Sequence, residues 1–328
     1  MIQLSDIMAA RRNISGLTVK TPLQYSFLLS KMTGCDIYLK LENVQRTGAF
    51  KVRGAVNKMT TLSPEERAKG VVAVSSGNFA LGVAYAARAL GGIPATLFMP
   101  VNTPASKVEK LSVFDVELVL KGADFEEAYD ISREFQQERG LTFVHSYDDP
   151  LVVAGQGTVG LEIMEDLPEV EAVLVPIGGG GLIAGIAVAV KAINPQARVI
   201  GVQLESSPSA YLSLKEGHCY ERYKAGPTIA EGLAGGFGIV PFTIARDLID
   251  EVVLVDDDEI YEAIFVLLDK AHLVVEGSGA VGVAALLSGK IDLRGKKVAV
   301  VLSGGNIDTE VLSQAVSRGM GEGENAQI

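Results

Sequence analysis

The sequence predicts an α/β protein with two open, twisted and mostly parallel α/β domains. The chain has 328 residues, and two domains are the ordinary expectation for that length. Short apolar runs alternate with helical patterns, and turns rich in Gly, Ser and Asn separate them, as is typical of parallel strands joined by crossover helices. The alternation starts again after Asp149-Pro150, so we expect a second unit from there.

The first unit is predicted to contain four parallel strands. The apolar runs that indicate them cover residues 71–75, 95–99, 116–120 and 142–144. Helical periodicity follows the first three runs, in a helix that ends at Leu90 and in the segments 104–111 and 125–139. A strand at 36–41 and a helix at 52–59 precede this unit.

The second unit is predicted over the rest of the chain. We expect strands at 172–177, 199–203, 251–255 and 297–302, and helices at 152–167, 182–193 and 258–271. The Gly-rich segment 217–240 is the least regular, and we expect it to form a long loop over a site because apolar helices follow it. Residues 319–328 are expected to fray.

Composition narrows the class of function. The formal net charge of −11 argues against a nucleic-acid partner, which would require clustered Lys and Arg, and it fits a cytoplasmic enzyme. No apolar run is long enough to span a membrane, and the N-terminus does not have the pattern of a signal peptide. Cys35 and Cys219 form no CxxC motif, so zinc and redox sites have no support.

Lys51 is the candidate nucleophile. It follows Thr47-Gly48-Ala49-Phe50 between a predicted strand and a predicted helix, a position from which a lysine can reach into a cleft. Burial beside Phe50 would lower its pKa and free the amine for imine chemistry. The alternative is a solvated lysine in the first turn of a helix.

Ser75-Ser76-Gly77-Asn78 lies between a strand and a helix, where backbone N–H groups suit a carboxylate. The alternative is an ordinary helix start capped by Asn78.

A second loop also joins a strand to a helix and consists of Gly178, Gly179, Gly180 and Gly181. Its bare backbone favours close approach to a phosphate. Ser303, after the last strand, places a hydroxyl where α/β proteins bind ligands, although a plain turn explains it equally well.

Taken together, these motifs resemble the fold-type II pyridoxal-phosphate enzymes, whose fold is that of the tryptophan synthase β subunit. The closest likeness is to the short, catabolic-type threonine/serine dehydratases, and it runs from about residue 5 to residue 317. The motifs that carry it, in the family's order, are Leu41-Glu42-Asn43, Gly48-Ala49-Phe50-Lys51, Ser76-Gly77-Asn78, Gly155-Gln156-Gly157-Thr158, the four glycines, Glu276-Gly277-Ser278-Gly279 and Ser303-Gly304-Gly305-Asn306.

The resemblance implies a large cofactor-binding domain of residues 1–47 and 149–328, and a small mobile domain of residues 48–148. It implies pyridoxal 5'-phosphate as the cofactor, bound covalently by Lys51, which would also remove the substrate's α-proton. Phe50 would lie beside the ring, Asn78 would bind its phenolic oxygen, and Ser303 would bind its pyridine nitrogen.

The four glycines, Gly178 to Gly181, would bind the cofactor phosphate, and the segment Ser75, Ser76, Gly77 and Asn78 would bind the substrate carboxylate. The implied activity is that of a lyase in amino-acid catabolism, which converts L-threonine, L-serine or a related 3-hydroxy amino acid to a 2-oxo acid and ammonia. The resemblance also implies a homodimer or homotetramer that acts on a small amino acid.

Rival functions stay open. Ser76 occupies the position of the second acid/base in serine racemase, so racemase activity is an alternative. Phe79, where Thr is common in β-replacement enzymes, disfavours that chemistry. A non-catalytic protein that binds the cofactor or an amino acid is a third reading, which the presence of Lys51 disfavours. No catalytic role is expected for His145, His218 or His272.

Several positions depart from the dehydratase pattern. Ala49, Phe79 and Leu81 replace the usual Ser, His and Gln, which makes the site less polar and favours a bulkier or more apolar substrate. Some relatives bind a divalent cation through two acids; Glu205 is present, but Tyr211 stands where the second is expected, and we assign no metal ligands. We also expect no C-terminal regulatory domain and no feedback by isoleucine.

Overall fold

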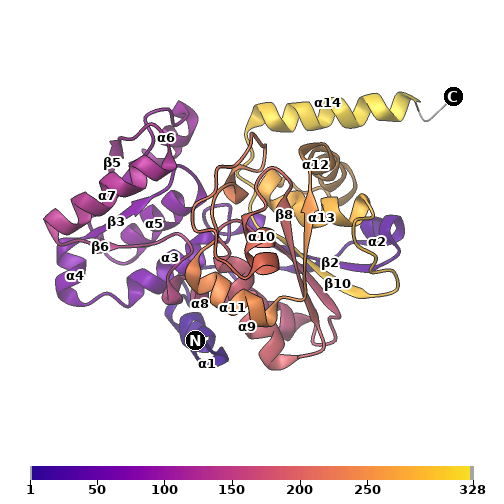
Figure 1. The fold of residues 1–328 in the computed structure, drawn as a ribbon, viewed down its shortest axis with the longest axis horizontal. Coiled ribbons are helices and arrows are strands. Elements are labelled where there is room, and N and C mark those ends of the chain that lie inside the picture. Colours follow the sequence, from indigo (N-terminus) through magenta and orange to yellow (C-terminus); the bar gives the residue numbers. More distant parts are fainter. Residues whose placement is uncertain (1, 326–328) are drawn as a thin grey trace.

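The structure, a computed structural model, describes residues 2–325 and contains two sheets (Figure 1). One sheet has six strands in the order β1-β2-β10-β7-β8-β9, and the other has four in the order β5-β4-β3-β6. Every neighbouring pair is parallel except β1 and β2. The predicted α/β class is therefore confirmed, with one antiparallel strand added at an edge.

The four-stranded sheet forms as the sequence predicts. Its strands are β3 (Val71–Val74), β4 (Ala95–Met99), β5 (Glu117–Leu120) and β6 (Thr142–Phe143). The crossover helices are α5 (Asn78–Ala89), α6 (Ala105–Leu111) and α7 (Phe125–Arg139). The two central strands, β3 and β4, are buried along their whole length, which explains why they are continuous apolar runs.

The six-stranded sheet combines distant parts of the chain. Its strands are β1 (Leu23–Tyr25), β2 (Asp36–Leu41), β7 (Ala172–Pro176), β8 (Arg198–Leu204), β9 (Glu251–Val255) and β10 (Lys297–Leu302). The last strand, β10, lies between β2 and β7, and Leu302 pairs with Leu41. The carboxyl ends of an early, a middle and a late strand therefore meet at one edge.

Helices cover both sheets. The long ones on the six-stranded side are α8 (Pro150–Asp166), α9 (Gly181–Ile193), α12 (Asp257–Ala271), α13 (Gly277–Leu287) and α14 (Thr309–Asn325). The others are α1 (Leu4–Asn13), α2 (Phe27–Thr33), α3 (Lys51–Thr60), α4 (Pro64–Lys69), α10 (Ser209–Glu216), α11 (Ile239–Leu248), and the short 3-10 turns η1 (Glu42–Val44) and η2 (Glu231–Leu233). Among the described residues, no helix is both long and apolar enough to cross a membrane.

The C-terminal helix is longer than the sequence predicts. Residues 319–325 were expected to fray, but they continue α14, whose Gly319 packs against Phe265 of α12; residues 326–328 lie outside the described part. The division into domains of residues 1–47 with 149–328 and of 48–148 stays a prediction.

Helix α3 packs against both α5 and α8. It therefore lies at the seam between the four-stranded and the six-stranded unit.

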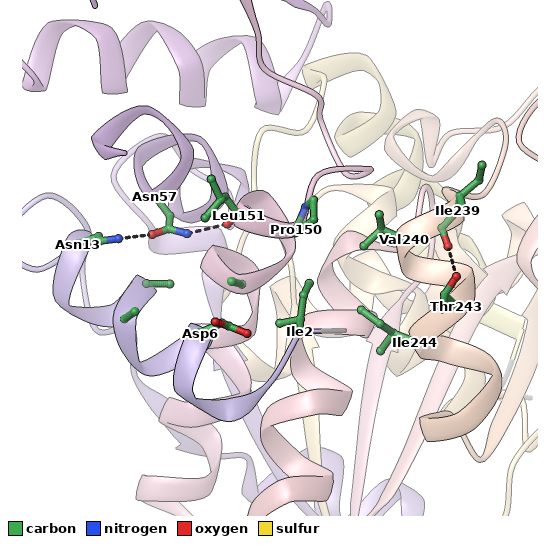
Figure 2. Close-up of a pocket in the computed structure, with 13 residues that line it drawn as sticks. Ile2, Asp6, Asn13, Asn57, Pro150, Leu151, Ile239, Val240, Thr243 and Ile244 are labelled. Atoms are coloured by element: carbon green, nitrogen blue, oxygen red, sulfur yellow. Dashed lines mark hydrogen bonds between the residues drawn. The ribbon is translucent and has the colours of Figure 1, made fainter. Parts of the chain in front are cut away.

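A chain of side-chain amides links three helices at this seam. Asn57 of α3 accepts a hydrogen bond from Asn13 Nδ2 of α1 at 2.9 Å and donates one to the carbonyl oxygen of Leu151 in α8 at 2.7 Å (Figure 2). Asn57 is fully buried, and both bonds satisfy polar atoms that would otherwise be costly to bury. They also border a groove that opens between α1, α8 and α11.

A buried cluster of four charges holds α3 against the six-stranded sheet. The guanidinium of Arg53 binds Glu42 at 2.8 Å and Glu162 at 2.7 Å, and Lys40 Nζ binds Glu162 at 2.6 Å. Burial alone would raise the pKa of Glu42, but the charge and hydrogen bonds of Arg53 outweigh it and lower that pKa. Two cations and two anions balance, so no net charge is buried.

We predict that Arg53→Ala lowers the free energy of unfolding by about 3–5 kcal/mol, because Glu42 and Glu162 lose their partner inside the protein. Chemical denaturation followed by far-UV circular dichroism measures it. Arg294→Ala is the control: that residue pairs with Asp292 on the surface and its loss should leave stability unchanged. A loss at Arg53 below about 1 kcal/mol would contradict this account of the cluster.

Candidate active site

The segment before Lys51 is joined to the segment after β10 by backbone hydrogen bonds. Phe50 N donates to the carbonyl oxygen of Ser303 at 3.0 Å, and Gly305 N donates to that of Gly48 at 2.8 Å. Ala49 also forms a bridge with Gly304. Lys51, the first residue of α3, therefore begins its helix beside Ser303, as the sequence motifs predict.

Lys51 is half-buried. Its Nζ lies 5.0 Å from the centre of the Phe50 ring. Burial lowers the pKa of the Lys51 amine to about 8, although the nearby carboxylate of Glu276 acts in the opposite direction. About a tenth of the amine is therefore uncharged at pH 7, many times the fraction for an ordinary lysine, and the alternative of a solvated lysine does not describe this site.

The loop from Ser75 to Asn78 does not form an ordinary helix cap. Gly77 occupies the N-cap position of α5 and Asn78 is already inside the helix, with its side chain pointed elsewhere. Asn78 Nδ2 donates to Glu276 Oε1 at 2.6 Å, and Asn78 Oδ1 accepts from Asn306 Nδ2 at 2.8 Å. The capping alternative is thus wrong, because the amide serves tertiary contacts.

Ser76, Gly77 and Asn78 line a cleft of about 330 Å³. Its wall near α5, α6 and the start of α14 is mixed: Leu81, Pro104, Leu111, Ile307 and Val311 are apolar, whereas Ser106, Lys107, Lys110 and Asp308 are polar or charged. Its other lining residues include Glu276, Ser278 and Asn306. The loop from Ser76 to Asn78 and Glu276, whose carboxyl group acts on Lys51, therefore share one cleft of a size suited to a small molecule.

Close packing excludes side chains from the glycine loop, in addition to the expected role of this loop in phosphate binding. A Cβ on Gly179 would overlap the ring of Tyr147, and Gly180 has a φ of +89° and lies against Phe237. Packing alone therefore requires glycine at both of these positions. However, no acceptor is present among the described residues for the N–H groups of Gly178 to Gly181, which lie at the start of α9. Those donors remain available to an anion.

The predicted loop over the site lies where expected. Gly238 N donates to the carbonyl oxygen of Gly179 at 3.1 Å, and Glu231 and Gly232 line the cleft. An ion pair between Glu231 and Lys107 of α6 connects this loop to the helix across the cleft. The loop therefore closes one side of the site.

Sequence reasoning gave no role to Glu276, Asn306 or Tyr147, which all touch predicted site residues. Glu276 and Asn306 lie inside family motifs, so their positions could have indicated a role in the site. No sequence motif contains Tyr147. Ser303 is buried, and its hydroxyl lies 3.3 Å from the carbonyl oxygen of Ser278.

Two of the departures from the dehydratase pattern separate in space. Phe79 is buried in the core of the four-stranded unit, whereas Leu81 lines the cleft. Glu205 forms an ion pair with Lys290 at 2.8 Å, and no group of His, Cys, Asp and Glu that could hold a metal occurs in residues 2–325. Of Phe79 and Leu81, only Leu81 lines the cleft.

His145 is an acceptor inside the protein. Its Nδ1 accepts the backbone N–H of Asp148 at 2.8 Å, and burial lowers its pKa to about 4, against the pull of Asp148. A neutral imidazole that fixes the turn at Tyr147 needs no catalytic role.

The groove in Figure 2 is a different kind of cavity. It measures about 470 Å³, and of its described lining residues Asp6 alone carries a charge. Neither Lys51 nor the glycine loop lines it. Its described lining contains no lysine, cysteine or histidine.

Comparison with known proteins agrees with this geometry. A family described as "Pyridoxal-phosphate dependent enzyme" matches residues 14–304. An L-threonine ammonia-lyase of Thermotoga maritima is 50% identical over 98% of this chain and 79% of its own length. The catabolic L-threonine dehydratase of Escherichia coli K12 is 44% identical over 95% of each chain.

Solved structures give the same result. Maize serine racemase is 36% identical, with a TM-score of 0.91 over 98% of this chain and 99% of that one. The processed threonine deaminase isoform 2 of Solanum lycopersicum is 37% identical, with a TM-score of 0.90 over 96% and 91% of the two chains. The resemblance inferred from the motifs is confirmed: the chain belongs to the family of pyridoxal-phosphate-dependent enzymes.

Proposed function

We propose that the protein is an ammonia-lyase that uses pyridoxal 5'-phosphate to convert L-threonine, L-serine or a related 3-hydroxy amino acid to a 2-oxo acid and ammonia. One observation carries the proposal: an amine with a pKa of about 8, at Lys51, lies at the strand edge that also bears a loop of free backbone donors. The relatives named as threonine ammonia-lyase and threonine dehydratase support the choice of reaction.

The residues present fit the cofactor. The N–H groups of Gly178 to Gly181 have no acceptor among the described residues and would bind the phosphate at the start of α9. Phe50, Asn78 and Ser303 would hold the ring, and Lys51 would attach to it. The cofactor, when bound, supplies an electron sink that stabilises negative charge at the substrate's α-carbon.

Lys51 and the Ser75–Asn78 loop would then act on the substrate. The loop's backbone binds the carboxylate, which orients the α-carbon toward the amine. Lys51 Nζ, uncharged in part near neutral pH, accepts the α-proton. Leu81 and Leu111 line the cleft and would suit a methyl or larger substituent on the β-carbon. Ser303 offers a hydroxyl, not a carboxylate, which favours quick loss of the leaving group.

Racemase activity is the second candidate. Ser76 lines the cleft beside Asn78, and no hydrogen bond of its hydroxyl is found in the described part of the chain. A free hydroxyl on the far side of the substrate is what a second proton carrier requires. The likeness to maize serine racemase supports it. Chiral chromatography of substrate recovered from a turnover mixture would separate the two: a pure lyase leaves L-serine unracemised.

Assembly and location are further proposals. We propose a cytoplasmic homodimer or homotetramer. Tyr25 of β1 and Phe27, Leu28 and Met32 of α2 are exposed apolar residues in one short stretch beside the edge of the six-stranded sheet. Exposed apolar patches of this kind are typical of subunit interfaces, which supports the oligomer.

We predict that Lys51→Ala abolishes the visible absorbance of bound cofactor and lowers kcat for 2-oxo acid release by at least about 10³-fold, because the amine both holds the cofactor and moves the proton. Release from Ser, Thr and larger 3-hydroxy amino acids is measured for each enzyme. Lys69→Ala, an exposed lysine on α4, is the control and should match the wild type. A Lys51→Ala protein that stays yellow and active would refute the proposal.

We also predict an unusual pH profile for covalent uptake of pyridoxal phosphate by the apoprotein. At pH 8 about half of Lys51 should be neutral, against about 0.3% of a lysine with the ordinary pKa of 10.5. Burial lowers this pKa, so the reactive fraction rises with pH and is half-maximal near pH 8. Stopped-flow absorbance gives the profile, and a midpoint above pH 10 would show that the amine is solvated.

A further inference from the structure

The side-chain amide of Asn78 is fixed by two partners from different parts of the chain. Asn306, which follows β10, donates from Nδ2 to Asn78 Oδ1 at 2.8 Å. Glu276, at the N-cap of α13, accepts from Asn78 Nδ2 at 2.6 Å. Asn78 therefore has its oxygen and one of its two N–H groups occupied, and a single N–H remains.

The orientation of the Asn306 side-chain amide is determined by its neighbours. Asn306 Nδ2 lies 2.8 Å from the carbonyl oxygen of Thr47, which can only accept a hydrogen bond, as well as 2.8 Å from Asn78. Both protons of Asn306 Nδ2 are thereby used, and the atom of Asn78 that faces it must be the oxygen. Thr47 in this way determines the orientation of Asn306, and Asn306 determines that of Asn78.

Glu276 adds an electrostatic preference for the same orientation. A Cβ on Gly304 would overlap the Glu276 carboxyl group, and Glu276 N donates to the Gly304 carbonyl oxygen at 3.0 Å. The carboxyl group thus lies close to the segment that contains Ser303. Burial raises the pKa of Glu276 to about 7, so above that pH the group is a carboxylate, which accepts an N–H but repels a carbonyl oxygen. Rotation of the Asn78 amide by 180° is then unfavourable at both ends.

We propose that Glu276 and Asn306 are positioning residues that act through Asn78, holding its amide so that an N–H, and not the carbonyl oxygen, faces the cofactor. The inference rests on the proposed function, in which Asn78 binds the phenolic oxygen of the cofactor. That oxygen is an acceptor when ionised, and a reversed amide would place two acceptors against each other. Glu276 and Asn306 would therefore influence cofactor affinity through the orientation of Asn78.

A double-mutant cycle tests action through Asn78. Pyridoxal phosphate is titrated into the apoenzymes, and visible absorbance gives the dissociation constant, independent of turnover. Asn306→Asp should weaken binding about tenfold in the wild-type background, because it removes both donors and favours the reversed amide. In the Asn78→Ala background the same change should alter binding by less than about twofold, since no amide remains to be oriented.

A second pair of variants, at Glu276, tests the same inference if the Asn306 or Asn78 variants do not fold. Glu276→Met removes the acceptor and should weaken binding several-fold, whereas Glu276→Gln keeps an acceptor oxygen and should restore most of the affinity. Asn194→Asp is the matched control: it makes the same chemical change at the far end of α9, about 20 Å from Gly181, and should leave binding unchanged.

The outcomes are distinct. Equal weakening by Asn306→Asp with and without Asn78, or no weakening at all, would overturn the inference, as would equal losses in Glu276→Met and Glu276→Gln. A wild-type protein that binds no pyridoxal phosphate would instead refute the proposed function, and this inference with it. Loss of affinity for Asn306→Asp only when Asn78 is present is the result that we expect.

Discussion

The pairing of the segment 48–50 with the segment 303–305 is the constraint on which the site depends. Two backbone hydrogen bonds, from Phe50 to Ser303 and from Gly305 to Gly48, join chain segments that are about 250 residues apart. They are possible because β10 inserts between β2 and β7, so the ends of these strands share one edge. Without that insertion, Lys51 and Ser303 would not lie close together.

The surrounding structure keeps this edge rigid while the cleft stays open. The charge cluster around Arg53 secures α3, which starts at Lys51, against the end of β2 and against α8. The loop of residues 217–238 packs on the glycine turn through Gly238 and pairs with α6 through Glu231. Burial that stabilises the fold also lowers the pKa of Lys51, so the same packing that stabilises the protein prepares its amine for chemistry.

Local patterns predicted most of the fold, since strands such as β4 and helices such as α7 have strong periodicity and clear ends. The antiparallel strand β1 was missed because three residues carry no measurable alternation, and α13 because its Gly-rich start resembles a turn. Short motifs pointed to Lys51, Ser76 and Gly178 as candidate site residues. Tyr147 was not, because its contact with Gly179 is purely tertiary, and neither was the way in which Glu276 and Asn306 hold Asn78.

The central claim is that one particular amine forms the covalent link to the cofactor. Borohydride reduction of the cofactor-loaded protein, followed by proteolysis and mass spectrometry, locates that link directly. The account predicts a phosphopyridoxyl group on the peptide that contains Lys51 and on no other lysine. Labelling of a different lysine, or of none, would contradict it.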